Sequence, residues 1–376
     1  MTSTKKDPVV VILQLTGGND YFNTIIPYND SIYYDNRPYV KYERDQIIPI
    51  DSQLGFMPTM GPVKELYDQG KVAILHGIGY PNSPRSHFRS MDIWHTCEPD
   101  KVGTEGWAGR VARELDPNKE NVLTAINFGH GLPRALAVPG VPVASIADLG
   151  TYGLLTGITD QSQRNKALEL FSRMYSPTVG GGMVGDYLRA TGTDAMRGAD
   201  IVKVAPERYS STIEYPNSPI ATHLRDIAQV YLADLGTRIF YTQHGSFDTH
   251  AGEAAAHPKL WQEVSEGIAA FFQDLHEHGR GDNVIMYLFS EFGRRVHDNG
   301  SGTDHGAAGV SFFIGDPIKG GMYGEYPSCK PEHLEQGDLV PNYDFRGAYS
   351  TIVEDWFKLD GKPIVNGNFE KMPVLK

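Results

Sequence analysis

Cysteine is scarce in this chain of 376 residues, which contains only Cys97 and Cys329. The two lie far apart and form no Cys-x-x-Cys pair, so neither a disulfide framework nor a thiolate zinc site is indicated. Any metal would therefore be held by histidine and carboxylate side chains.

Long apolar runs and positive charge are lacking too. No stretch of about 18 apolar residues could span a bilayer, and a content of 40% hydrophobic and 21% charged residues is typical of a folded globular protein. The 34 Lys and Arg residues are outnumbered by 46 Asp and Glu, which gives a formal net charge of -12. Such a chain repels a polyphosphate backbone unless a basic patch intervenes. We see no such patch, so nucleic acid is not an expected partner.

The amino terminus, MTSTKKDPVVVILQL, shows no export signal. Its apolar run is short and β-branched and lacks a small-residue cleavage site, so we interpret it as a first strand. The chain as written is therefore expected to be cytoplasmic. A chain from which a signal had been removed would look the same, so export is the alternative.

Strand-like and helix-like segments alternate along the chain. Short continuous apolar runs predict strands buried on both faces, at 8–15, 71–79, 237–243 and 283–290. Apolar residues at helical spacing predict helices at 58–69, 162–176, 218–235 and 256–278. This alternation predicts an α/β fold in which a mostly parallel central sheet has helices on both faces, with its ligands beyond the carboxyl ends of the strands.

The length of the chain fits one large α/β domain, which we take to be residues 1–376. Its middle, about 130–215, is less regular and rich in Pro, Gly and Ser, so we interpret it as a cap or insertion and not as a second domain. Within it, GLLTGITD (153–160) and VGGGMVGD (179–186) are predicted loops. The region 316–343 is predicted to be a surface loop.

Acidic and histidine side chains gather beside glycines where the predicted strands end. Imidazole nitrogen and carboxylate oxygen are the ligands that zinc takes, and one sheet edge can collect them from separate strands. We therefore expect a divalent metal here, zinc first, with Mn, Ca or Mg as alternatives. The residues concerned are Asn19 and Asp20, then His244, Asp248 and His250, then Glu291, Asp304 and His305.

Each of these residues also has a plain structural interpretation. Asp20 after two glycines is a common turn residue, and Asp248 is a possible cap for the helix that follows. Glu291 is a possible ion-pair partner of Arg294 or Arg295. His305, flanked by an acid and glycines, has no apolar face to pack on. Their joint placement therefore favours a metal site.

A candidate nucleophile, Ser86, lies in YPNSPRSHFRSMDIWHTC. It opens a stretch with helical spacing, where free N–H groups and the helix dipole favour negative charge on its oxygen. Serine is also a favoured helix cap, which is the alternative explanation. The neighbouring His87 and the arginines Arg85 and Arg89 favour anion chemistry.

Several motifs, taken in order, resemble the DUF1501 family, which is itself similar to the alkaline phosphatase and sulfatase superfamily. The resemblance runs from about residue 8 to residue 358. The motifs are GGND near the start, SHF at 86–88, GW at 106–107, DTH at 248–250, SEFGRR at 290–295, GTDHG at 302–306 and KGG-x-YG at 319–324.

The superfamily resemblance implies roles for residues already singled out. It implies an acid at the end of the first strand, a nucleophile at a helix start, a metal bound by an acid and two histidines, and an acid of a second metal site. The acid at the end of the first strand would be Asp20, and the nucleophile would be Ser86. The first metal would be bound by Asp248, His250 and His305, and the acid of the second site would be Glu291. Phe292 stands where the superfamily has histidine, which puts the second site in doubt. No Cys-x-Pro-x-Arg sequence is present for a formylglycine.

The function expected from these features is metal-dependent hydrolysis of phosphate or sulfate esters, with Ser86 as the nucleophile and His87 beside it as a catalytic residue. The substrate is a small anionic ester. Alternatives are a non-catalytic metal- or ligand-binding protein of the same fold, or a phosphotransferase or mutase. The residues expected to contact substrate are Asn19, Arg89, His244 and Asp304, with Arg85 and Arg110 as further candidates to clamp its free oxygens.

Overall fold

The computed structural model describes residues 6–150, 152, 160–174, 194, 198–199 and 201–376. Of the two loops predicted in the middle of the chain, 153–160 lies outside the described residues except for Asp160. The other, 179–186, lies outside them altogether.

The described elements alternate between strand and helix for most of the chain. The strands are β1 Val9–Leu15, β2 Ile25–Ile26, β3 Ile48–Pro49, β4 Gly55–Phe56, β5 Val72–Gly79, β6 Ala125–Phe128, β7 Ala144–Ile146, β8 Ile239–His244, β9 Val284–Phe289, β10 Gly309–Ile314, β11 Gly321–Tyr323 and β12 Tyr343–Asp344. The α-helices are α1 Tyr21–Thr24, α2 Ser31–Asn36, α3 Gly61–Asp68, α4 His87–Thr96, α5 Trp107–Leu115, α6 Gln161–Met174, α8 Val204–Arg208, α9 Pro219–Leu232, α10 Glu253–Glu277, α11 Phe345–Ser350 and α12 Lys362–Val365. Short 3-10 turns lie at Pro58–Met60, Arg134–Leu136 and Pro331–His333, and a π-helical turn at Thr351–Trp356.

A nine-stranded sheet forms the centre of the described part of the molecule, in the order β11-β5-β10-β9-β1-β8-β6-β7, with β12 also paired to β5. The run β9-β1-β8-β6-β7 is parallel throughout. β10 alone is antiparallel to its neighbours β9 and β5. The predicted α/β class with a mostly parallel sheet is therefore confirmed.

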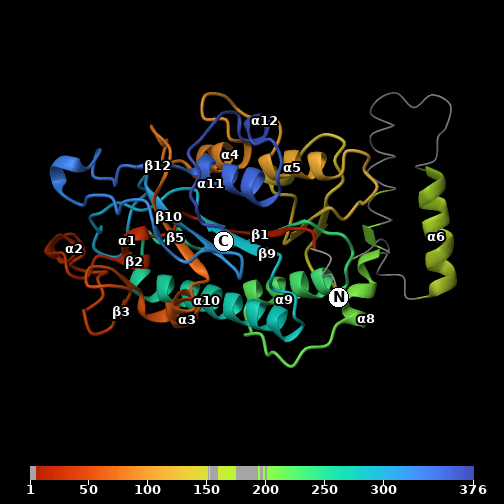
Figure 1. The fold of residues 1–376 in the computed structure, drawn as a ribbon, viewed down its shortest axis with the longest axis horizontal. Coiled ribbons are helices and arrows are strands. Elements are labelled where there is room, and N and C mark those ends of the chain that lie inside the picture. Colours follow the sequence, from red (N-terminus) through yellow and green to blue (C-terminus); the bar gives the residue numbers. More distant parts are fainter. Residues whose placement is uncertain (1–5, 151, 153–159, 175–193, 195–197, 200) are drawn as a thin grey trace.

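Two helical layers cover the two faces of this sheet, as Figure 1 shows. Helices α4, α5, α11 and α12 lie on one face, and α3, α9 and α10 on the other. Residues of β1 pack toward both helical layers, because alternate residues of a strand point to opposite faces. Val9, Val11 and Leu13 join the core under α9 and α10, whereas Val10 and Ile12 join the core under α4 and α5. The burial of β1 on both faces, as predicted, is confirmed.

Helix α10 shows why the helices pack where they do. Its buried apolar residues recur at steps of three and four, as in Trp261, Val264, Ile268, Phe271 and Leu275. That spacing forms one apolar stripe along an α-helix, which faces the sheet. No helix among the described residues has both the length and the apolar character needed to cross a membrane.

Two predicted irregular regions contribute strands to the main sheet. Residues 316–343 were predicted to be surface loop, but β11 within them pairs with β5, with Met322 opposite Ile74. That prediction was wrong because a three-residue edge strand is too short to show an alternating pattern. β7, within the predicted cap at 130–215, pairs with β6 at the sheet edge. The cap itself remains a prediction.

Candidate functional site

The carboxyl ends of β1, β8 and β9 lie together at one edge of the sheet. β1 pairs in parallel with both neighbours, so that Leu15 lies opposite His244 and Gln14 opposite Phe289. The loops that follow these strands therefore begin side by side. This arrangement brings together residues that are more than two hundred positions apart in sequence.

Two glycines allow the loop after β1 to pack tightly against the loops after β8 and β9. Gly17 and Gly18 have φ of +123° and +80°, which side chains disfavour. A Cβ on Gly17 would lie 2.4 Å from the Asp248 backbone nitrogen, and one on Gly18 would lie 2.4 Å from the Phe292 ring. The GG of the GGND motif is thus needed for close approach as well as for the turn.

Three histidines converge on the carboxylate of Asp248. His250 Nε2 and His305 Nε2 lie 3.1 and 3.0 Å from Asp248 Oδ1, and 2.9 Å from each other. His87 Nε2 lies 3.4 Å from the other oxygen, Oδ2. Donor atoms of His87, Asp248 and His305 all lie within 4.8 Å of one another. We call His87, Asp248, His250 and His305 the donor cluster.

The second ring nitrogen of each histidine is held by a hydrogen-bond acceptor. His250 Nδ1 lies 3.0 Å from Asp304 Oδ1. His305 Nδ1 lies 2.9 Å from the Arg85 carbonyl oxygen, and His87 Nδ1 lies 2.8 Å from Glu291 Oε1. A carbonyl or carboxylate oxygen accepts, so each Nδ1 donates its proton. In a neutral imidazole this leaves the lone pair on Nε2.

These tautomers fit the binding of a cation. The lone pairs of His250 and His305 would otherwise face each other at 2.9 Å, which is stable only if a proton or a cation lies between them. Metal-bound histidines donate their other N–H to a carboxylate or carbonyl in the same way. The donor set, imidazole nitrogen with carboxylate oxygen, suits zinc and similar divalent ions.

The Asp248 carboxylate remains ionised over a wide pH range. Burial opposes its ionisation, but the hydrogen bond and charge of Arg294 and the close contact with His305 outweigh this and lower the pKa of Asp248 to about 2. The guanidinium of Arg294 is 2.7 Å from Asp248 Oδ1 and also donates to the carbonyl oxygens of Gly18 and Thr303. Arg294 thereby links the loops after β1, β8 and β9.

His87 is held from two sides. Its hydrogen bond to the fully buried Glu291 raises the pKa of His87 above its usual value. Glu291 in turn accepts a 2.9 Å hydrogen bond from the Gly17 backbone. The Phe292 ring packs against His87 and His305, with centroids 4.9 and 4.8 Å away. Glu291 therefore reaches the donor cluster through His87.

Ser86 precedes α4, as predicted, and its side chain does not cap the helix. It is flanked by two residues in contact with the donor cluster. Arg85 accepts from His305 through its carbonyl oxygen, and His87 is a member of the cluster. The alternative that Ser86 is present to cap the helix is therefore not supported by its hydrogen bonds.

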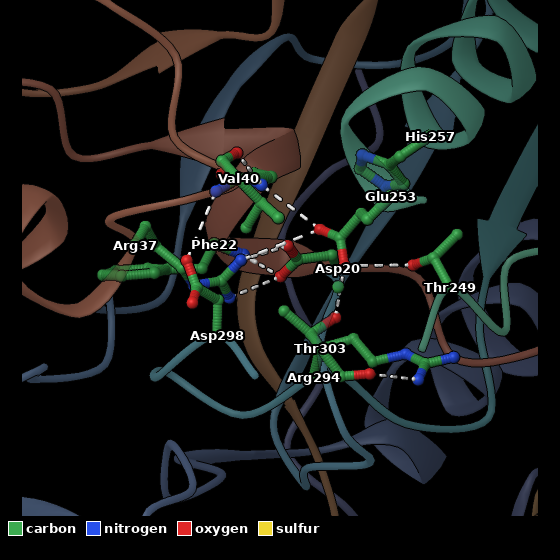
Figure 2. Close-up of polar contacts among 12 residues, drawn as sticks. Asp20, Phe22, Arg37, Val40, Thr249, Glu253, His257, Arg294, Asp298 and Thr303 are labelled. Carbon is green, nitrogen blue, oxygen red and sulfur yellow. Dashed lines mark hydrogen bonds and ion pairs between the residues drawn. The ribbon is translucent and has the colours of Figure 1, made fainter. Parts of the chain in front are cut away.

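Asp20 is not brought to the donor cluster. Its carboxylate is fully buried and pairs with Arg37, with Arg37 Nη1 2.5 Å from Oδ2 and Nη2 2.9 Å from Oδ1, as Figure 2 shows. Burial alone would raise its pKa, but the charge and hydrogen bonds of Arg37 lower the pKa of Asp20 below its usual range. One oxygen also accepts from the Phe22 backbone at the start of α1. In this arrangement Asp20 holds Arg37 and not a metal.

The residues expected to contact substrate have other partners. Asn19 is buried, and its Oδ1 accepts from Thr24, His257 and Trp261. Arg89 pairs with Asp92 and donates to the carbonyl oxygens of Glu98 and Pro99. His244 is buried beside Glu263 at 3.3 Å, and burial lowers its pKa to about 4. Asp304 accepts from His250 Nδ1 and so orients that ring.

The two arginines proposed as further clamps are also engaged within the protein. Arg85 pairs with Asp338, and Arg110 donates to the carbonyl oxygens of Thr96, Glu105 and Ile364.

Glu253, a buried acid that the sequence did not indicate, supports the loops that carry the donor cluster. Glu253 Oε2 accepts hydrogen bonds from Thr303, at 2.6 Å, and from Thr249, at 3.2 Å, as seen in Figure 2. Its other oxygen accepts from Asn23 at 3.2 Å and lies 3.8 Å from Arg37. Burial and the charge of Asp20 raise the pKa of Glu253. An acid in the first turn of α10 gives no sequence signal of this role, because acids are common there.

Fold and site together define an α/β protein with a histidine-carboxylate cluster at the carboxyl edge of a mostly parallel sheet. Residues 184–349 match the family described as "Protein of unknown function (DUF1501)". This match confirms the resemblance to the DUF1501 family that the motifs indicated. No curated protein matches the sequence.

Solved structures of similar overall fold include sulfatases and phosphatases. The sulfatase PsFucS1 from Pseudoalteromonas sp. is 12% identical with a TM-score of 0.44, covering 98% of this chain and 71% of that one. The C-terminal periplasmic domain of EcEptC from Escherichia coli is 10% identical with a TM-score of 0.39, covering 100% and 93%. Alkaline phosphatase from the Antarctic bacterium TAB5 is 12% identical with a TM-score of 0.35, covering 83% and 93%.

Proposed function

We propose that the protein is a metal-dependent hydrolase of phosphate or sulfate esters, with Ser86 as the nucleophile. One observation carries the proposal. His250 and His305 direct their Nε2 atoms at each other and at Asp248 Oδ1, all within 3.1 Å, while acceptors hold both Nδ1 protons on the far side. Such a set of lone pairs favours a bound cation, and Ser86 lies next to it in the chain.

Asp248, His250 and His305 are the proposed ligands, and His87, the fourth member of the donor cluster, would remain off the ion. Zinc is the first choice for this ligand set, with Mn, Ca or Mg as alternatives. When bound, such an ion would lower the pKa of a nearby hydroxyl or water and neutralise charge on a phosphoryl or sulfuryl oxygen.

The chain's own residues would do the remaining chemistry. Ser86 Oγ would lose its proton to solvent water and form a bond to phosphorus or sulfur as the bond to the ester oxygen breaks. His87, which Glu291 favours in its protonated state, lies beside Ser86 and would give a proton to the departing alcohol oxygen. Water would then attack the same phosphorus or sulfur as its bond to Ser86 Oγ breaks. Ser86 Oγ would take up a proton of that water, and His87 would regain its proton from solvent.

The test is metal analysis of the purified protein, followed by assays on aryl phosphates, phosphodiesters and aryl sulfates. We expect about one or more divalent ions per chain and an activity that Ser86→Ala lowers by several orders of magnitude. His333→Ala, at an exposed histidine far from these residues in sequence, is the control and should retain both. The proposal would be refuted if the purified protein contained no metal and hydrolysed none of the esters.

A second candidate is a metal- or ligand-binding protein that does not catalyse. The contacts of three arginines favour this candidate. The guanidinium groups of Arg85, Arg89 and Arg110 are engaged within the protein and are not placed to clamp a substrate. Arg294 also puts a fixed positive charge 2.7 Å from the carboxylate that would hold the ion. Bound metal without activity on any ester would decide for this candidate.

A further inference from the structure

A cavity of about 470 Å³ lies beside the donor cluster, between segments 80–85 and 335–341. Arg85 and Ala307, which line it, connect it to the cluster. The Arg85 carbonyl oxygen accepts from His305, and Ala307 follows His305 by two positions. The cavity begins at Tyr80, where β5 ends, and so lies at the carboxyl edge of the sheet. Ligands of α/β proteins bind at this edge.

Two buried polar atoms in the cavity wall make no hydrogen bond to the described residues, namely Ser83 Oγ and Asp338 Oδ1. Asp338 Oδ1 has only a longer ion-pair contact, 3.7 Å from Arg295 Nε. Asp338 is only 2% exposed, and its other oxygen is 2.6 Å from Arg85 Nε. A buried polar atom without a partner costs about 1–3 kcal/mol unless a water or a ligand supplies the bond. This wall can therefore both donate to and accept from a bound molecule.

The remaining lining argues against a second anionic group. The Asp338 carboxylate pairs with the guanidinium groups of both Arg85 and Arg295, and Glu335 adds a second negative charge to the wall. Prolines at 81, 84 and 341 contribute rigid apolar faces. A lining of apolar faces with a few polar groups is typical of sites for small organic ligands, and this volume is within their usual range.

We infer that this cavity binds the alcohol part of the ester substrate, and that this alcohol is a neutral ring bearing several hydroxyl groups, such as a monosaccharide unit. Hydroxyl groups donate and accept, as Ser83 Oγ and Asp338 Oδ1 require. The ring's carbon faces suit the prolines. The inference rests on the proposed function, because the donor cluster next to the cavity would hold the anionic part of the same ester.

The test uses methyl glucoside as a neutral probe, and saturation-transfer NMR measures its binding to the full chain. Val340 lines the cavity and is 41% exposed, so Val340→Trp fills the space without removing a core residue. We expect this variant to weaken probe binding at least about tenfold, and Ser83→Ala to weaken it about threefold to fivefold. Val102→Trp, at a valine that is 67% exposed and does not line the cavity, should bind the probe like the wild type.

The same variants separate this inference from the proposed function. If esters are hydrolysed, Val340→Trp should lower kcat/KM for glucose phosphate or glucose sulfate about tenfold and leave that for methyl phosphate unchanged. Hydrolysis without any glucoside binding, or binding that Val340→Trp leaves intact, would overturn the inference alone. Glucoside binding to a chain that hydrolyses no ester would instead overturn the proposed function and leave the cavity assigned.

Discussion

Glu253 accepts a 2.6 Å hydrogen bond from the hydroxyl of Thr303 (Figure 2), and both side chains are buried. Thr303 is two positions before His305. The same carboxylate oxygen accepts from Thr249, which lies between Asp248 and His250. The Thr303 backbone nitrogen also donates to the Thr249 carbonyl at 3.1 Å. One buried acid therefore holds together the two loops that carry the proposed metal ligands.

From this relationship we expect Thr303→Val to weaken zinc binding about tenfold, because the loop bearing His305 loses its tie to Glu253. Thr303→Ser keeps the hydroxyl and should bind zinc like the wild type. Titration calorimetry measures the affinity. Thr24→Val is the matched control, since Thr24 is an equally buried threonine whose hydroxyl binds Asn19 and the Asp20 carbonyl.

Both valine variants should lose about 1–3 kcal/mol in the free energy of unfolding. Only Thr303→Val should also lose metal affinity. Equal zinc affinities for the two variants would mean that Glu253 stabilises the fold without positioning the ligands.

Asp304 offers a second test of how the histidines are held. Asp304→Ala removes the acceptor for His250 Nδ1 and should weaken zinc binding about 10–100-fold, whereas Asp304→Asn, which retains an acceptor oxygen, should lose less. Asp234→Ala removes an exposed carboxylate paired with Arg280 and serves as the control. If Asp304→Ala and Asp234→Ala bind zinc equally well, His250 is not a ligand.

Much of the fold and part of the site could be predicted because strong local signals mark them. The run VVVILQL has no polar residue except Gln14, which is typical of a strand buried on both faces. The motifs DTH and GTDHG place acids and imidazoles beside glycines, and the structure brings Asp248, His250 and His305 within 3.1 Å of one another. Their roles as ligands remain a prediction that metal analysis must test.

What sequence could not provide was the direction of each side chain. Asp20 lies two positions after Gly18, yet it faces Arg37, which comes from an irregular segment seventeen positions later. No periodic pattern in the sequence indicates that Arg37 is its partner. Glu253 shows the same limit, because an acid at the start of a helix is normally exposed and favoured by the helix dipole. Here the fold buries it to 1% exposure.

His87 should give the metal-free protein a pH-dependent stability. Its pKa is raised in the folded state by Glu291, so the stabilising contribution is complete below the unfolded value of about 6.5 and is lost as pH rises through the folded value. Denaturant unfolding with a chelator present should show a stability difference between wild type and His87→Gln at pH 5.5 that shrinks toward pH 9. Glu291→Gln should remove the same pH dependence. A difference that does not change with pH would contradict this account.

The close approach of Gly18 to Phe292 can be tested with one added methyl group. Gly18→Ala combines an unfavourable φ of +80° with a Cβ that would lie 2.4 Å from the Phe292 ring, which itself packs on His87 and His305. Gly70→Ala is the matched control, because Gly70 has a φ of +70° and nothing within 4 Å of the added carbon.

We expect Gly70→Ala to cost about 1 kcal/mol in unfolding free energy, the ordinary penalty for a left-handed alanine. Gly18→Ala should cost about 1–3 kcal/mol more, because a well-packed site must shift to accept the extra carbon. It should also weaken zinc binding, since the ring that supports both imidazoles must move. Adding Phe292→Leu to Gly18→Ala relieves the contact and should recover part of the stability. If the double variant is as unstable as the sum of its single changes, the cost of Gly18→Ala lies in the backbone and not in the contact with Phe292.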